Sequence, residues 1–143
     1  MGIILSIIAG LAMTFQGVFN TRLQEKVGAF EANTIVQGTA FILALILLFF
    51  LGKGNIREVK DINKIYLLGG VIGVIITYTV MGSIASIGTT FAISTILIAQ
   101  LLSAAIMEWF GWFGTEKIPF SFHTIAGVAI MIIGILVFKF MKF

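Results

Sequence analysis

The stretch ANTIVQGTAFILALILLFFL, residues 32–51, contains no charged side chain over twenty consecutive positions. A helix rises about 1.5 Å per residue, so twenty residues cover the roughly 30 Å hydrocarbon core of a bilayer. Lipid offers an exposed backbone no hydrogen-bond partners, and this stretch lacks the polar–apolar alternation of a barrel strand. The stretch therefore predicts a membrane-spanning helix.

Other parts of the chain have the same character. The sequence predicts five transmembrane helices, at about 3–21, 30–51, 65–86, 88–108 and 122–140. Hydrophobic residues make up 59% of the chain and charged residues 10%, compared with about 25% in ordinary soluble domains. The predicted fold class is an all-α integral membrane protein, a single five-helix transmembrane domain over residues 1–143. We expect it in the lipid bilayer of a bacterial or archaeal plasma membrane.

Composition and missing motifs exclude several function classes. The chain has no cysteine, so disulfides and thiolate metal sites are impossible. Its net charge of +3 is spread over loops without a basic cluster, which argues against a nucleic-acid partner. The sequence contains no phosphate-binding loop, nucleophile elbow or metal-spaced His/carboxylate motif. We therefore expect no enzyme activity, no metal and no cofactor.

The basic residues give almost no preferred orientation. Five spans place the amino end and the segments near 52–64 and 109–121 on one face, called side A, and the remaining segments on the opposite face, side B. Side A carries five basic residues and side B four; they are Lys53, Arg57, Lys60, Lys64 and Lys117, against Arg22, Lys26, Lys139 and Lys142. The positive-inside rule then favours neither direction. Either one or two residues or an assembly partner fix a single orientation, or copies insert both ways.

The odd number of spans adds to this argument. Many transporters consist of two halves of inverted topology with the substrate site between them. This chain has no internal repeat, so it can serve as such a half only beside an inverted copy of itself or an inverted paralogue.

Polar side chains inside the predicted spans are the candidates for a substrate pathway, since polar groups at that depth are costly. The candidates are Gln16, Asn20, Asn33, Gln37, Tyr78, Gln100 and Glu108. Helical rise puts Gln16, Gln37 and Tyr78 about 4–6 Å from the midplane toward side B and Gln100 near the centre. Amides also act as interhelical hydrogen bonds, so each residue has a packing alternative. Glycines that permit close helix contact, within one protomer or at a dimer seam, are Gly69, Gly73, Gly127 and Gly134.

Four blocks of sequence resemble one family. GLAMTFQGVFNTRLQEKVGAFEANTIVQG (10–38), LGGVIGVIITYTV (68–80), IAQLLSAAIMEWFGWFG (98–114) and FHTIAGVAIMIIGILV (122–137) are similar to the YdcZ-like branch of the drug/metabolite transporter superfamily. The resemblance implies one five-helix half of an inverted-repeat transporter.

The sequence thus predicts a secondary transporter half-unit that acts as an antiparallel, dual-topology homodimer. It would move a small polar or amphipathic solute by alternating access. A dual-topology channel, a heterodimer subunit and a non-transporting membrane scaffold are the alternatives.

Overall fold

A computed structural model describes residues 1–119 and 121–140, so Lys142 of the side B count lies outside the described residues. The long helices of this part are α1 (Gly2–Val27), α2 (Ala29–Leu51), α3 (Gly69–Ile87), α4 (Thr89–Phe110) and α5 (Phe122–Phe140). Each is long and apolar enough to cross a bilayer, α3 together with the short helix η2 (Lys64–Leu68) before it. The predicted all-α fold with five spans is confirmed.

The first helix is longer than the sequence predicts. α1 continues to Val27 instead of ending at residue 21, and its 26 residues extend over about 39 Å. Its charged last turns carry Arg22, Glu25 and Lys26, and Arg22 Nη1 lies 3.0 Å from Glu25 Oε2. The charges mark the point where the helix leaves the hydrocarbon, not the point where it ends, because the backbone keeps its helical hydrogen bonds in the interface as well.

Among the other predicted starts, only that of the third helix shifts by more than one residue. α3 begins at Gly69, because residues 64–68 form the separate 3-10 turn η2. The side chain of Asn63 caps this turn by accepting the Ile65 N–H at 3.1 Å. A second 3-10 helix, η1 (Ile56–Lys60), precedes it in the segment between α2 and α3.

One glycine joins α1 to α2. Gly28 has φ 101° and ψ 156°, a backbone region open essentially only to glycine. Its N–H donates to the Gln24 carbonyl, and its own carbonyl accepts the Ala32 N–H, each at 3.0 Å. Gly88, with φ 81° and ψ 158°, makes the same junction between α3 and α4. The chain therefore passes from helix to helix without a loop at both places.

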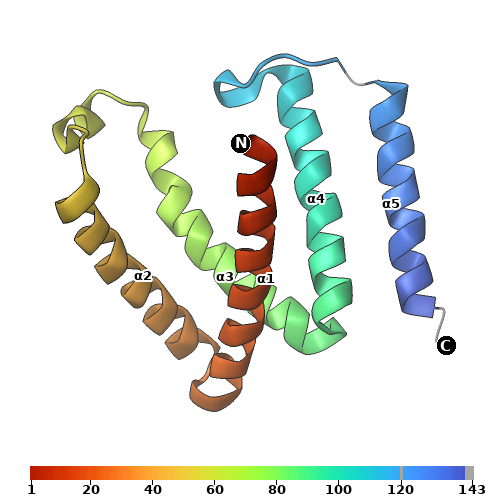
Figure 1. Ribbon diagram of the computed structural model, residues 1–143, viewed down its shortest axis with the longest axis horizontal. Coiled ribbons are helices and arrows are strands. Elements are labelled where there is room, and N and C mark those ends of the chain that lie inside the picture. Colours follow the sequence, from red (N-terminus) through yellow and green to blue (C-terminus); the bar gives the residue numbers. More distant parts are fainter. Residues whose placement is uncertain (120, 141–143) are drawn as a thin grey trace. The chain divides into compact units, whose positions relative to one another are not determined.

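The described chain divides into two compact units, Met1–Ser86 and the part from Ile87 onward. The single five-helix domain expected from the sequence stays a prediction. In the first unit, α1 and α2 meet at Gly28 and diverge toward their other ends (Figure 1). Buried residues gather near the junction: Gly17, Asn20, Thr21, Ala32, Asn33, Thr77, Met81 and Ile84. Four of these eight are polar, so the packed end of this unit is held by polar groups as well as by apolar contact.

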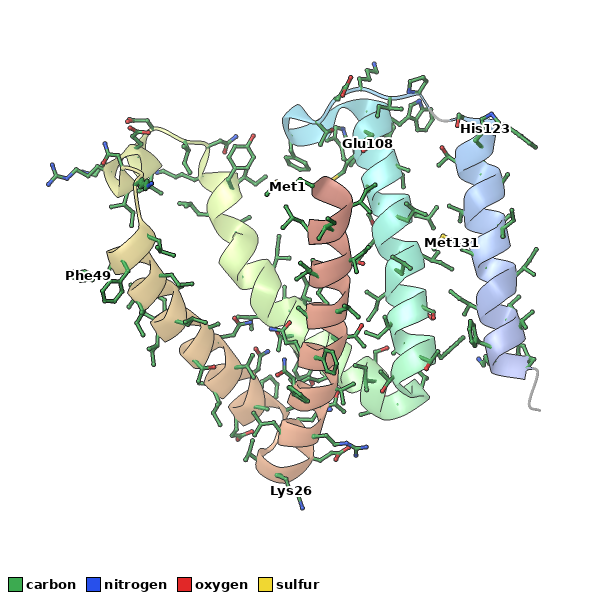
Figure 2. The ribbon with its side chains drawn as sticks, viewed as in Figure 1. Met1, Lys26, Phe49, Glu108, His123 and Met131 are labelled. Carbon is green, nitrogen blue, oxygen red and sulfur yellow. The ribbon has the colours of Figure 1, made fainter. Side chains whose placement is uncertain are left out.

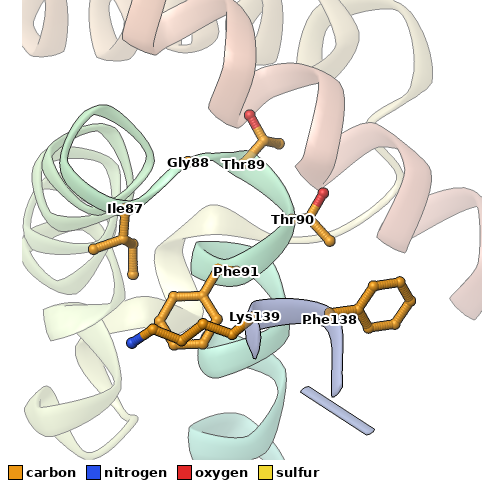
Figure 3. Close-up of a pocket in the computed structure, with 7 residues that line it drawn as sticks. All are labelled: Ile87, Gly88, Thr89, Thr90, Phe91, Phe138 and Lys139. Carbon is orange, nitrogen blue, oxygen red and sulfur yellow. The ribbon is translucent and has the colours of Figure 1, made fainter. Parts of the chain in front are cut away.

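The second unit contains α4 and α5, which lie side by side (Figure 1). The segment between them folds back on α4: the Ile118 N–H donates to the Glu108 carbonyl at 3.0 Å, and Thr115 Oγ1 to the Met107 carbonyl at 3.1 Å. At the other end of the pair, Lys139 Nζ lies 4.3 Å from the ring centroid of Phe91 (Figure 3). A cavity of about 450 Å³ adjoins this contact.

Several hydroxyl side chains in the spans are bonded to carbonyls of their own helices. Thr14, Thr95 and Ser103 each donate to the carbonyl four residues earlier, at 2.8–3.0 Å. Such a bond removes most of the cost of placing a hydroxyl in lipid. Hydroxyls are therefore poor markers of a pathway here, and the amides are better ones.

Candidate substrate pathway

Two of the candidate amides hold α2 against α3. Asn33 Nδ2 donates to the Val74 carbonyl at 2.8 Å, and Gln37 Nε2 to Thr77 Oγ1 at 3.1 Å. Asn33 and Gln37 are four residues apart and therefore share one face of α2. Gly73 lies on the facing side of α3, where an added Cβ would stand 3.9 Å from Gln37 Nε2. These contacts are interhelical hydrogen bonds of the kind that the packing alternative describes.

Asn33 also has an unsatisfied atom. Only 4% of the residue is exposed, and its Oδ1 has no hydrogen-bond partner among the described residues. The Nδ2 bond to the Val74 carbonyl fixes the amide's orientation, since the reverse placement would set two oxygens against each other. A buried acceptor at this position calls for a donor from a water or a solute.

Aromatic stacking positions Tyr78 in the same unit. The Tyr78 ring stacks on Phe30 with centroids 5.2 Å apart and ring planes 22° apart. The side chain is 42% exposed. Asn20 is buried at the packed end. Four candidates thus lie around the packed end of the first unit: Asn20, Asn33, Gln37 and Tyr78.

Gln24 joins this set, although the sequence analysis did not single it out. Its Nε2 donates to the Met81 carbonyl at 3.1 Å and ties α1 to α3. Gln24 continues the line of Gln16 and Asn20 at a spacing of four residues, which is the signal that could have found it. It was missed because the predicted helix ended before it.

Gln16 and Gln100 behave differently from the bonded amides. Both are exposed, and neither makes a hydrogen bond in the described part of its unit. Gln16 lies on α1 of the first unit and Gln100 on α4 of the second. An amide facing hydrocarbon without a partner costs several kcal/mol. The faces of α1 and α4 that carry these residues are thus poorly suited to lipid.

Glu108 lies in the last turn of α4, at the same end of the α4–α5 pair as His123 (Figure 2). It lines a cavity of about 230 Å³ in the second unit. Three of the four singled-out glycines, Gly69, Gly127 and Gly134, have open space where a Cβ would stand. Only Gly73 has a neighbour there. No group of three or more His, Cys, Asp or Glu residues suited to a metal ion occurs in the described residues.

The comparison with protein families gives the identity. Residues 1–137 match the family described as "Putative inner membrane exporter, YdcZ". The chain belongs to the YdcZ family. This membership confirms the resemblance found in the sequence. The family's description is that of an inner-membrane exporter, which is a class of transporter rather than of enzyme. No curated protein matches the chain, and no solved structure does.

Membership covers the parts of the YdcZ chain that carry the polar groups. The matched range contains all five helices almost to the end of α5, and with them every candidate residue of the pathway. The comparison names no substrate and no assembly. Those questions depend on the residues themselves.

Proposed function

We propose that this YdcZ protein is a secondary transporter half-unit that works as an antiparallel homodimer and moves a small polar or amphipathic solute by alternating access. The observation that carries the proposal is the pair of unbonded, exposed amides, Gln16 and Gln100. Each needs a polar surrounding inside the membrane, and a substrate pathway completed by a second subunit would supply one.

Three further features support the proposal. The nearly equal number of basic residues on the two sides permits insertion in both directions. The odd number of spans gives each copy the parity of one half of an inverted repeat. The Asn33 Oδ1 acceptor offers a solute donor a buried contact in the packed end of the first unit.

The bonded and unbonded amides then have different roles. Gln24, Asn33 and Gln37 keep α3 attached to α1 and α2, so the first unit can move as one body. Gln16 and Gln100 contact the solute, together with Asn20 and Tyr78. The glycines with open space, Gly69, Gly127 and Gly134, are sites where another helix can approach closely.

Single-cysteine labelling tests the proposal, because the chain has no cysteine of its own. Gly54→Cys reports orientation: Gly54 lies between α2 and η1, has open space around it, and its replacement leaves the Lys/Arg balance unchanged. In intact cells we expect about half of the copies to react with a membrane-impermeant maleimide, because half would face outward. Labelling of all copies or of none contradicts dual insertion and would require another protein to supply the inverted half.

The same reagent tests the pathway. Gln100→Cys should react with the maleimide from water. Ile98→Cys is the control: residue 98 lies at nearly the same depth but about 200° around α4, so it faces away from the pathway and should not react. Equal reactivity of the two variants would count against a hydrated pathway at Gln100. A hydrated Gln100 with flux far above the turnover of a carrier would favour the channel instead.

A further inference from the structure

The cavity beside Glu108 has a defined construction that the proposed function does not use. Leu101 and Ala104 of α4 and Ile118 and Pro119 of the following segment form apolar walls. Thr124 of α5 contributes a hydroxyl, and Glu108 contributes the cavity's single ionisable side chain. The volume of about 230 Å³ lies below the roughly 300–1,000 Å³ of sites for drug-sized ligands, so a ligand here must be small.

Hydrogen bonds to the carbonyls at the end of α4 hold one wall of the cavity in place. The Glu108 carbonyl accepts the Ile118 N–H at 3.0 Å and the Gly111 N–H at 3.2 Å. Thr115 Oγ1 donates to the Met107 carbonyl at 3.1 Å. The segment after α4 is thereby attached to the helix end, and Ile118 and Pro119 are held opposite the α4 residues.

The cavity's charge is uncompensated. The Glu108 carboxylate makes no hydrogen bond or ion pair within the described residues, and the last turn of α4 contains no basic residue. The carbonyl end of a helix adds partial negative charge at the same place. Lys117 is the nearest basic residue in the chain, and it packs its stem beside Gly111 without pairing with Glu108.

We propose that this cavity binds a small ammonium group, carried either by a short primary amine or by the ethanolamine headgroup of a lipid. The carboxylate of Glu108 would accept charge-assisted hydrogen bonds from the ammonium, and the Thr124 hydroxyl would accept a further one. The alkyl part would lie against Leu101 and Ala104. The inference rests on the proposed function only in making such an amine a candidate for the transported solute.

The two tryptophans of the chain provide the measurement without a label. Trp109 and Trp112 are one and four residues after Glu108, so their fluorescence reports on this end of α4. Ethylammonium chloride, titrated into detergent-solubilised protein against sodium chloride of equal ionic strength, should give a saturable fluorescence change. Glu108→Gln should weaken the affinity roughly tenfold or more through loss of the charged acceptor.

Matched variants separate this site from a general charge effect. Glu116→Gln removes a carboxylate of the same segment that does not line the cavity, and it should bind as the wild type does. Lys117→Gln should strengthen binding a few-fold. Equal binding by the wild type and Glu108→Gln overturns the inference. The inference is also overturned if the Lys117→Gln variant binds ethylammonium and the wild type does not, because the lysine ammonium would then occupy the cavity.

Binding measurements in nanodiscs of two lipid compositions identify the source of the ammonium. Weaker ethylammonium binding in phosphatidylethanolamine than in phosphatidylcholine identifies the lipid headgroup as the occupant, and equal binding identifies a soluble amine. Both results support the site. A failed titration leaves the cysteine-labelling results untouched, since these concern orientation and Gln100 and not Glu108.

Discussion

The amides of this protein fall into two groups at the scale of single residues. Gln24, Asn33 and Gln37 donate to α3, two of them to backbone carbonyls. Gln16 and Gln100 donate to nothing in the described part of their units. A hydrogen bond made in the membrane identifies a packing role more directly than the depth of the residue in the predicted span does.

Replacing Asn33 should therefore weaken the first unit. Asn33→Ala removes the bond to the Val74 carbonyl, and we expect the free energy of unfolding to fall by about 0.6–2 kcal/mol. Denaturation in mixed detergent micelles, followed by circular dichroism, measures the change. Gln16→Ala is the control, because it removes an amide without such a bond. An equal loss of stability in both variants would show that the distinction between bonded and unbonded amides is wrong.

The polar residues were visible in the sequence, whereas two of their contacts were not. Composition and spacing pointed to all seven pathway candidates, and their role in a pathway stays a prediction. The bond between Gln24 and Met81 was not visible, because its acceptor is a backbone carbonyl and carries no signature of its own. The same holds for the Val74 acceptor of Asn33.

At the scale of helices, the glycine junctions decide how elements connect. An added Cβ at Gly28 would meet only the carboxylate of Glu31, the end of a flexible and exposed side chain that can move aside. The positive φ of Gly28 is unfavourable for any other residue. Gly88 also has a positive φ, with open space around it. The two junctions thus share a backbone conformation that only glycine adopts without strain.

Gly28→Ala should lower the free energy of unfolding by about 1–3 kcal/mol from backbone strain, because the Glu31 side chain can rotate away from the new methyl group. Gly88→Ala should lower it by a similar amount, since Gly88 has the same kind of backbone conformation. Gly10→Ala, in open space within α1, should cause no loss, since alanine favours a helix over glycine. Thermal unfolding of the three variants in one detergent makes the comparison. A Gly28→Ala variant as stable as Gly10→Ala would contradict the strain argument.

Helix positions were predictable because hydropathy reports where the hydrocarbon is. Helix ends were less so, because a helix can continue beyond the hydrocarbon while its backbone bonds persist. α1 shows the difference most clearly, since Arg22 and Lys26 end the apolar run without ending the helix.

At the scale of the whole molecule, the basic residues on the two sides of the membrane nearly balance. α1 extends through the interface, so Arg22 and Lys26 occupy helix turns close to the membrane surface, where basic residues influence orientation. The difference in basic residues between side A and side B is small enough for a few substitutions to create a clear bias. The proposed antiparallel dimer can therefore be tested with variants biased in each direction.

Two variants with opposite bias should assemble with each other but not with themselves. Lys53→Gln, Lys60→Gln and Lys64→Gln together leave two basic residues on side A against four on side B. Lys26→Gln with Lys142→Gln leaves five against two. Each variant should insert in one orientation and purify as a monomer, and the two should co-purify through different tags when expressed together. Stable dimers of either variant by itself would establish a parallel assembly.

The whole-molecule questions were the least predictable from the sequence. Family membership extends the sequence argument to a family described as an inner-membrane exporter, because the family model matches residues 1–137. The partner and the solute leave no comparable pattern in one chain. In our proposal they are contacted by exposed amides such as Gln16 and Gln100, which make no hydrogen bond in the described part of their units.

The one-residue junctions at Gly28 and Gly88 have a practical consequence. With five crossings, both junctions belong to side B. The connections between helices on that side are therefore too short for protease cleavage or for insertion of an epitope. The segments after α2 and after α4, on side A, are where the chain can be nicked or lengthened. Digestion from one side of the membrane would therefore sort the copies by orientation, since only those presenting their longer segments would be cleaved.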